Sequence, residues 1–475
     1  RPGPLIAVAP PLPVCHHPPV LRADHLAGLL DGRLEAAGGA SLDVTELVSD
    51  SRAVTPGAGF VALPGERMDG HAFVAEAARR GAVLGVVGEG FAGAEAPPVL
   101  IRVPDTARAL RAACRRRIDE LGCAVVGVTG SVGKTTAKEM CALALAGRPT
   151  ARTPGNLNTW TQIPLFVLGL EPPVERLVVE MAMTAPGEIA DLASFTAPRV
   201  GLLLNIGLAH IGRLGSEEAI ASAKAELLDA LPADGAAVLN ADDPRVVGVA
   251  SRSRAPVAWF GLTNPLATWR LEDVEADGLL GCRAWLVGPD GRARLHLGTP
   301  GRHLLADAAA AAAVAAACGV GIAEAAERLG AFTPPDHRGR IIAGRSGSTI
   351  IDDAYNSSPA SLAAALEVLA GSGAPRRLAI IGDMLELGER TEDAHREAGR
   401  LAAGAATLLI AVGDQVAIMG AAAVAAGLPS SAVAYARDAD AAADLAGPHL
   451  EPGTAVLVKA SRGLGLDRVV ERLRR

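Results

Sequence analysis

Short apolar runs alternate with stretches of helical length along most of the chain. The run at 124–128 is apolar throughout, and comparable runs at 176–181, 200–205 and 236–240 follow it. Strands that are apolar on both faces and separated by helices are typical of a parallel sheet covered by helices. The hydrophobic pattern therefore predicts an α/β protein with a mostly parallel central sheet.

Interruptions of this alternation divide the chain into three α/β domains. A more polar, hairpin-like stretch at 267–297 precedes an alanine-rich helix near 308–318, and the proline-containing segment 333–340 is a candidate linker. Strands and helices alternate again after it, in a smaller doubly wound unit. The predicted divisions are a proline-rich N-terminal extension at 1–20, a smaller α/β N-terminal domain at 21–118, a central parallel-sheet domain at 119–335, and a Rossmann-like C-terminal domain at 336–475.

Composition narrows the class of protein. A chain of 475 residues, half of them apolar, is too long for one hydrophobic core but has globular proportions. A net charge of -7 disfavours a nucleic-acid partner, whose usual footprint is basic. Six cysteines without a C-x-x-C pair disfavour a zinc site or a disulfide framework. Because no apolar stretch is built like a membrane span and the opening segment lacks a signal-peptide pattern, we expect a cytoplasmic protein, and a monomer.

The stretch from 127 to 136 carries the clearest chemical signal. It reads Gly-Val-Thr-Gly-Ser-Val-Gly-Lys-Thr-Thr, between a buried strand and a helical pattern. In a phosphate-binding loop (P-loop), glycines let the backbone approach the phosphates, amides at the helix start point at them, and the lysine reaches the outer phosphates. The strict G-x-x-x-x-G-K-[ST] pattern is missed by one position, since residue 128 is valine. The setting still predicts a nucleoside-triphosphate site at Lys134, with the Thr135 hydroxyl on Mg²⁺.

Lysine is rare in this chain, which makes each lysine informative. Only four of the 45 basic residues are lysines, namely Lys134, Lys138, Lys224 and Lys459. Where arginine is otherwise preferred, a lysine marks a position that needs a compact charge or an amine able to lose its proton. Asparagine is also scarce, and five of its six occurrences fall in candidate site loops: Asn156, Asn158, Asn205, Asn240 and Asn356.

Two further candidates follow strands of the central sheet. Glu180 ends one strand, and His210 follows the strand that ends at Asn205. Ligands of open α/β sheets bind at the carboxyl ends of the strands, so both residues are expected near the phosphates. A carboxylate suits Mg²⁺. Taken alone, His210 is more often a structural or surface histidine, and Lys224 is an exposed helix lysine.

With these residues in place, the chain resembles the Mur ligases, the amide ligases of peptidoglycan-precursor synthesis, over nearly its whole length. Within that family it is most similar to members that add D-alanyl-D-alanine to UDP-N-acetylmuramoyl-tripeptide, from the segments 353–356 and 382–388. The resemblance implies that ATP converts a substrate carboxylate into an acyl phosphate, which an amine then attacks. The matching segments are 50–52, 59–66, 69–71, 129–136, 138–140, 153–158, 186–189, 205–210, 224, 240–243, 339–340, 352–356, 382–388 and 459–463.

The resemblance also implies roles for individual residues. The first domain would bind the UDP-substrate, the second ATP with two Mg²⁺ ions, and the third the acceptor dipeptide. Lys134, His210, Lys224 and Asp353 would be catalytic, with Thr135, Glu180, His210 and a carbamylated Lys224 holding the metal ions. ATP would contact Gly130, Ser131, Val132, Gly133, Lys134, Thr135, Thr136, Asn156, Asn240, Asp243 and Arg340. Ser51, Arg52, Asp69 and His71 would bind the UDP-substrate, and Asn356, Lys459, Ser461 and Arg462 the acceptor.

The chain departs from the family pattern at a few positions. Residues 159–162 are Thr-Trp-Thr-Gln where the family commonly has Asn-Glu-Ile-Gly, and 181–185 are Met-Ala-Met-Thr-Ala where it commonly has Leu-Gly-Ala-Asn-His. Leu304 and Asp307 replace the asparagines that usually follow His303. Both altered loops are expected near the reaction centre, so they bear on the choice of acceptor and not on ATP binding.

Other functions remain open from the sequence. Another Mur-type ligase, in particular the one that adds a diamino acid, is the nearest alternative, but its D-N-P-R signature is absent from the third domain. Folylpolyglutamate synthase shares the core without needing the first domain. A P-loop NTPase uncoupled from ligation and a catalytically silent relative are the alternatives from other classes. We expect Lys224→Ala to abolish most activity and Lys138→Arg to be mild.

Overall fold

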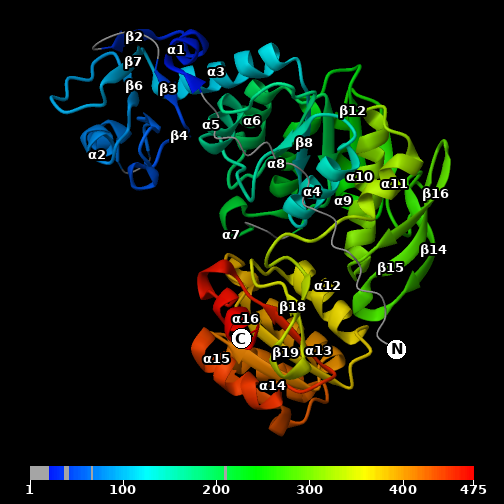
Figure 1. Ribbon diagram of the computed structural model, residues 1–475. Coiled ribbons are helices and arrows are strands. Elements are labelled where there is room, and N and C mark those ends of the chain that lie inside the picture. The colour runs from blue at the N-terminus through cyan, green and yellow to red at the C-terminus, as the bar shows by residue number, and fades with distance from the viewer. Residues whose placement is uncertain (1–20, 37–41, 66–67, 208–210, 475) are drawn as a thin grey trace.

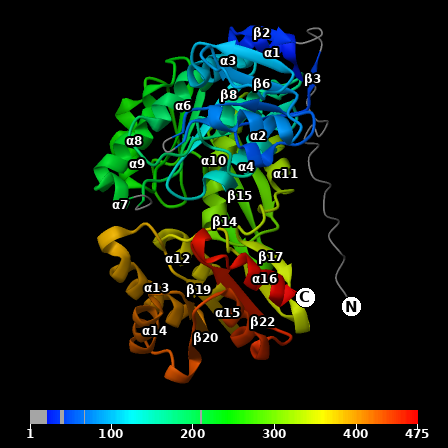
Figure 2. The same cartoon turned by 90° about the vertical axis from the view of Figure 1, so that its left-hand side faces the viewer.

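The computed structural model describes residues 21–36, 42–65, 68–207 and 211–474. The three largest sheets, one in each predicted domain, lie one after another along the molecule (Figure 1). Seen from the side, the third domain lies beneath the central one (Figure 2). The α/β architecture and its three parts are as predicted, whereas the boundaries between them stay predictions and the segment 1–20 lies outside the described residues.

The first domain is a five-stranded sheet in the order β2-β7-β6-β5-β4. Its strands are parallel except for β2, which pairs antiparallel with β7 at the edge. The long helix α3 leaves this sheet and packs against α5 and α6 of the central domain. The elements are β2 (Arg33–Ala36), β4 (Leu47–Val48), β5 (Gly59–Val61), β6 (Leu84–Gly88), β7 (Val99–Val103), α1 (Ala23–Leu30), α2 (Val74–Arg79), α3 (Thr106–Leu121), and β1 (Leu21–Arg22) paired with β3 (Asp43–Val44).

The central sheet is entirely parallel, in the order β13-β12-β11-β8-β10-β9. Because β8 lies between β10 and β11, the residues that follow these three strands meet at one edge of the sheet. This sheet comprises β8 (Ala124–Thr129), β9 (Thr150–Arg152), β10 (Arg176–Glu180), β11 (Val200–Leu203), β12 (Ala236–Asn240) and β13 (Val257–Phe260). Its helices are α4 (Lys134–Ala144), α5 (Gln162–Leu168), α6 (Glu188–Thr196), α7 (Ile211–Leu214), α8 (Glu217–Asp229), α9 (Pro244–Val249), α10 (Arg302–Ala317) and α11 (Ile322–Leu329).

The predicted hairpin is a three-stranded antiparallel sheet, β14-β15-β16, formed by Arg270–Ala276, Cys282–Gly288 and Gly291–Leu297. The alanine-rich α10 lies between this sheet and α4, and seven of its ten alanines are buried in the central core. Small side chains let α10 approach α4 closely, which explains its composition. No helix in the described part of the chain is long and apolar enough to cross a membrane.

The third domain is a six-stranded sheet in the order β17-β18-β22-β19-β20-β21, parallel except for the edge strand β17. Its helices lie on both faces, as the doubly wound prediction requires. The elements are β17 (Arg340–Ala343), β18 (Thr349–Asp352), β19 (Arg376–Gly382), β20 (Leu408–Val412), β21 (Val433–Ala436), β22 (Thr454–Lys459), α12 (Pro359–Ala370), α13 (Thr391–Ala405), α14 (Val416–Ala425), α15 (Ala439–Ala446) and α16 (Asp467–Arg474).

Candidate active site

The loop between β8 and α4 has the conformation that the glycines of the sequence predict. Gly133 takes φ +86° immediately before α4. A Cβ on Gly130 would lie 2.9 Å from Cβ of Leu204, so a larger residue has no room there. The Lys134 amine donates to the carbonyl oxygens of Gly130, at 2.9 Å, and Ser131, at 3.3 Å. This strand, loop and helix have the arrangement of a phosphate-binding loop, and the binding of an anion by its amides stays a prediction.

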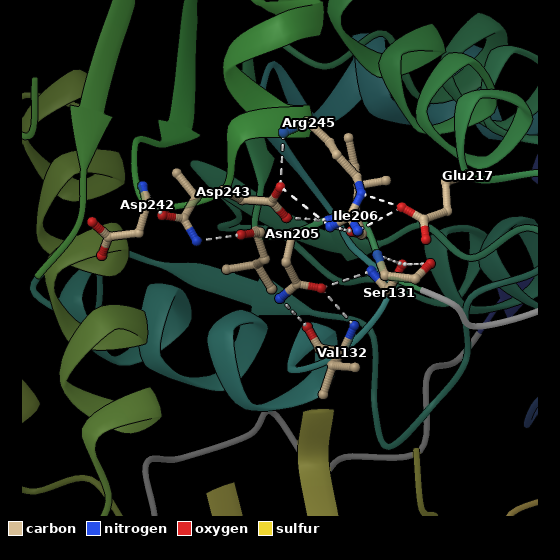
Figure 3. Close-up of polar contacts among 11 residues, drawn as sticks. Ser131, Val132, Asn205, Ile206, Glu217, Asp242, Asp243 and Arg245 are labelled. Carbon is tan, nitrogen blue, oxygen red and sulfur yellow. Dashed lines mark hydrogen bonds and ion pairs between the residues drawn. The ribbon is translucent and has the colours of Figure 1, made fainter. Parts of the chain in front are cut away.

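Asn205 holds this loop in place, a contact that the sequence did not predict. Its Oδ1 accepts from the amides of Ser131 and Val132, at 3.1 and 2.9 Å, and its Nδ2 donates to the Val132 carbonyl at 3.0 Å (Figure 3). Asn205 follows β11, the strand beside β8, so the sheet sets the distance between the two segments. The scarcity of asparagine in the sequence was the signal that marked Asn205 as a candidate.

Glu180 lies where its place after β10 predicts, beside the start of α4. Its carboxylate accepts from the Thr135 hydroxyl at 2.8 Å and from Nδ2 of Asn158 at 2.9 Å. A hydroxyl oxygen and a carboxylate next to a phosphate loop are hard ligands of the kind that Mg²⁺ takes. No group of three or more His, Cys, Asp or Glu side chains in the described residues could hold a metal ion. Phosphate oxygens, water or a modified side chain would have to complete the coordination.

Lys224 is buried, not exposed as a lone helix lysine would be. It lies on α8 with 2% of its surface exposed, and its amine donates to the carbonyl oxygen of Gly130 at 3.0 Å. Lys134 donates to the same oxygen. Burial, and then the neighbouring Lys134 charge, lower the pKa of Lys224 well below its ordinary value. An amine held in its uncharged form is a nucleophile. His210 lies outside the described residues, so its position relative to Lys224 stays a prediction.

Asn240 and Asp243, predicted near adenine, hold neighbouring backbone groups. Nδ2 of Asn240 donates to the Leu204 carbonyl at 2.8 Å. Oδ2 of Asp243 accepts from the Ile206 amide at 2.8 Å, as Figure 3 shows. Asp243 also begins α9 by accepting from the amide of Arg245. Both side chains thus fix the segment that follows β11, and any contact they make with a nucleotide stays a prediction.

Asn156 is exposed, in a loop whose backbone is held by a second buried lysine, Lys138. The Lys138 amine donates to the carbonyl oxygens of Thr153, at 2.5 Å, and Gly155, at 2.7 Å. Sequence reasoning gave Lys138 no role. Its position one helical turn beyond Lys134 was visible, but its partners on a different strand were not.

The third domain brings its predicted residues together at the carboxyl ends of β18 and β22. The Lys459 amine lies 2.5 Å from the Asp353 carboxylate and donates to the Asn356 carbonyl at 2.9 Å. The Ser461 hydroxyl accepts from the Leu385 amide at 2.9 Å. These contacts make a buried ion pair beside a polar loop, with Lys459 only 2% exposed.

Two arginines border this cluster. Arg462 donates to the Tyr355 hydroxyl at 2.7 Å, and Arg338 stacks on the same ring 3.9 Å from its centroid. Burial lowers the pKa of Lys134, Glu180 opposes that change, and the Arg338 charge adds to it. Arg340, the residue predicted to close onto the nucleotide, pairs with Asp336, and any contact it makes with a nucleotide stays a prediction. Arg338 is therefore the arginine of this segment whose charge acts on the phosphate loop.

Three of the four residues predicted for the UDP-substrate lie in two short 3-10 helices of the first domain, and Asp69 caps the second of them. The Ser51 hydroxyl donates to Glu76 on α2 at 3.2 Å, and Arg52 pairs with Asp50 at 2.8 Å. Nδ1 of His71 lies 2.6 Å from Asp69, while its Nε2 accepts from the Gly88 amide at 2.8 Å. The Asp69 contact leaves the proton on Nδ1. No described contact joins these two groups, so their shared role stays a prediction.

The two loops with unusual sequence are neighbours. The Ala182 amide donates to the Asn158 carbonyl at 3.4 Å, and the Asn158 amide donates to the Gln162 side chain at 3.3 Å, so the segments 181–185 and 159–162 are joined through Asn158. The Arg111 guanidinium lies 4.2 Å from the centroid of the Trp160 ring, between the first and central domains. Both loops therefore border the Glu180 carboxylate, as expected.

Comparison with known proteins gives one consistent result. Residues 43–118 match the family described as Mur ligase family, catalytic domain, residues 128–315 match Mur ligase middle domain, and residues 337–462 match Mur ligase, glutamate ligase domain. UDP-N-acetylmuramoyl-tripeptide–D-alanyl-D-alanine ligase of Mycobacterium tuberculosis is 36% identical over 89% of this chain and 91% of its own. The Escherichia coli ligase of the same name is 31% identical over 82% and 85%.

Solved structures agree with these relatives. A crystal structure of MurF from Acinetobacter baumannii aligns with a TM-score of 0.85 at 27% identity, covering 96% of this chain and all of that one. MurF ligase from Thermotoga maritima in complex with ADP aligns with a TM-score of 0.78 at 29% identity, covering 90% of this chain and 97% of that one.

Proposed function

The chain belongs to the Mur ligase family, and from that premise we propose that it joins D-alanyl-D-alanine to UDP-N-acetylmuramoyl-tripeptide at the expense of ATP. The reaction forms an amide bond and releases ADP and phosphate. The observation that carries the proposal is the order of the three sites. A P-loop at Lys134 lies in the domain between the first domain and a third domain that presents the Lys459–Asp353 pair.

The first half of the reaction needs a held triphosphate. We assign Gly130 to Thr136 to the β- and γ-phosphates, where the loop amides and Lys134 stabilise the charge that spreads over the transferred phosphoryl group. The tripeptide carboxylate attacks the γ-phosphorus, and the bond between that phosphorus and the β-γ bridging oxygen breaks. ADP is the leaving group, and the tripeptide becomes an acyl phosphate. The ADP complex of the T. maritima ligase supports the use of ATP.

Magnesium fits the residues beside this loop. Thr135 and Glu180 would hold one ion, which would supply positive charge to the phosphates. We assign a second ion to His210 and to Lys224 modified by carbon dioxide. The lowered pKa of the buried Lys224 amine favours its uncharged form, which would capture carbon dioxide and become an anionic oxygen ligand.

The second half of the reaction joins the dipeptide. Its amine attacks the acyl carbon, a tetrahedral intermediate forms, and phosphate leaves. Asp353, Asn356, Lys459, Ser461 and Arg462 are the proposed acceptor and catalytic residues of the third domain, with Arg462 the exposed cation among them. Closure of this domain over the phosphate loop would exclude water from the acyl phosphate.

The test is phosphate release with ATP, Mg²⁺ and UDP-N-acetylmuramoyl-tripeptide, with and without D-alanyl-D-alanine. The proposal expects release only with the dipeptide, together with a pentapeptide product by mass spectrometry. Release that depends on a different amine would make the chain another Mur-type ligase and would direct attention to 159–162 and 181–185. Release without any acceptor would indicate an NTPase that is not coupled to ligation.

A further inference from the structure

Asp307 is a buried carboxyl group beside the phosphate loop, at a position with no assigned role. It lies in the second turn of α10 with 8% of its surface exposed. Its two carboxylate oxygens are 3.5 and 3.7 Å from the point where Gly133 would carry a Cβ. Gly133 directly precedes Lys134, the first residue of α4. The Asp307 carboxyl group therefore lies against the N-terminal end of this helix.

The surroundings of Asp307 are apolar. Leu204, Leu304 and Leu305 are buried in the same core, and Cδ1 of Leu204 lies 3.7 Å from the same point at Gly133. Within the part of the chain that the structure describes, the carboxyl group has no hydrogen-bond or ion-pair partner. An ionised carboxylate is costly in such a place.

Few titratable groups face this carboxyl group. On α4, Cys141 is close enough that Asp307 helps to raise its pKa, and the Lys134 amine is engaged with loop carbonyls. On α10 itself, His303 lies one turn earlier. The strands β11 to β14 that pack on α10 contribute apolar side chains to this core. Burial alone raises the pKa of Asp307, to about 8.

We propose that Asp307 controls nucleotide affinity through its protonation, so that the phosphate loop binds ADP and ATP tightly only while this carboxyl group is neutral. The inference rests on the proposed ATP site. A neutral carboxyl group leaves the positive potential of the loop amides and of the α4 N-terminus intact. An ionised Asp307 carboxylate places a negative charge beside Gly133, across the loop from the phosphates. The low polarity of these surroundings strengthens the repulsion between this charge and the phosphates.

The experiment is equilibrium binding of ADP with Mg²⁺ to the full-length chain from pH 6.5 to 9.5, by calorimetry. The wild type should lose about tenfold in affinity as the pH rises, the change that corresponds to a shift of one pKa unit on binding. Asp307→Asn keeps the size of the side chain and cannot ionise, so its affinity should fall over this range by about tenfold less than that of the wild type. Cys141→Ala, which removes the neighbouring thiol, should decline as the wild type does.

Several outcomes would overturn the inference. A wild-type affinity for ADP that is constant across this pH range would overturn it without any variant. An Asp307→Asn protein whose affinity falls with pH as much as that of the wild type would overturn it as well. If Asp307→Asn does not fold, carboxyl ¹³C NMR of the wild type still decides, because ADP should raise the titration midpoint of Asp307 and an unchanged midpoint contradicts the inference. Absence of ADP binding at every pH would overturn the proposed function, and this inference with it.

Discussion

Replacing Lys138 by methionine is expected to destabilise the central domain. The side chain is fully buried, and its amine donates at 2.5 and 2.7 Å to the carbonyl oxygens of Thr153 and Gly155, and lies 3.1 Å from Glu139. Methionine fills a similar volume but cannot donate, and each carbonyl left without a donor costs about 1–3 kcal/mol. Part of this cost is offset, because burial lowers the pKa of Lys138 and therefore disfavours its charged form. The methionine variant no longer carries that buried charge. A net loss of about 2–3 kcal/mol follows, or roughly 5–10 °C in melting temperature.

The same substitution should slow turnover without weakening ADP binding. The segment that Lys138 holds also contacts Glu180, whose amide donates to the Thr153 hydroxyl at 3.2 Å and whose carboxylate accepts from Asn158. Releasing the segment lets this carboxylate move, and a displacement of about 1 Å near the reacting atoms can cost about 100-fold in rate. The loop amides that would bind ADP do not depend on Lys138. We therefore expect kcat to fall about 10- to 100-fold while the Kd for ADP changes little.

Two further variants make this prediction specific. The sequence predicted that Lys138→Arg would be mild, but a planar guanidinium is larger than the buried ammonium and cannot direct its donors in the same way. We now expect an impairment comparable to that of Lys138→Met. Arg148→Met is the control, because Arg148 is 61% exposed and forms only a surface ion pair with Glu175. A Lys138→Met protein that melts and turns over like the wild type would refute the reasoning.

Three other predictions follow from the site. Lys224→Ala should lose most activity and recover part of it with added short carboxylates, and full activity of Lys224→Arg would contradict the carbamate. Gly130→Ala should weaken ADP binding by about tenfold or more in calorimetry, since its Cβ would clash with Leu204. Gly404→Ala, which meets nothing within 4 Å, is its control. Asp307→Asn should melt higher than the wild type by a margin that grows from pH 4 to 8, because the wild-type carboxyl group ionises near 4 when unfolded and only near 8 when folded.

The sequence predicted the parts of the site that lie next to regular elements. A glycine-rich loop between a buried strand and a helix fixes its own geometry, so the region around Lys134 could be predicted from local pattern alone. Glu180 was predictable because parallel strands end at one edge of a sheet and β10 is the neighbour of β8. Such inferences need only the period of the hydrophobic pattern and the rule that ligands bind at strand ends.

Contacts between distant segments could not be predicted in this way. Lys138 resembles a surface lysine in a helical pattern, and only the packing of α4 against β9 and β10 shows that its amine reaches the loop at 153–155. Asp307 is far from Gly133 in sequence, and the two meet because α10 packs on α4. Sequence reasoning named Arg340 and did not consider Arg338, because the hydrophobic pattern does not show that Arg338 stacks on the Tyr355 ring.

The segment that joins the second and third domains takes part in the site itself. The Gly339 amide donates to the Asp352 carbonyl at 2.8 Å, the Tyr355 amide donates to the His337 carbonyl at 3.0 Å, and Nδ1 of His337 lies 2.9 Å from the Asp352 carboxylate. These bonds fold the segment onto β18 and fix Arg338 on the Tyr355 ring. Because the Arg338 charge contributes to the lowered pKa of Lys134, any movement of the third domain changes the electrostatics of the phosphate loop. We therefore expect domain closure and phosphate binding to be coupled through the Arg338 charge as well as through the exclusion of water.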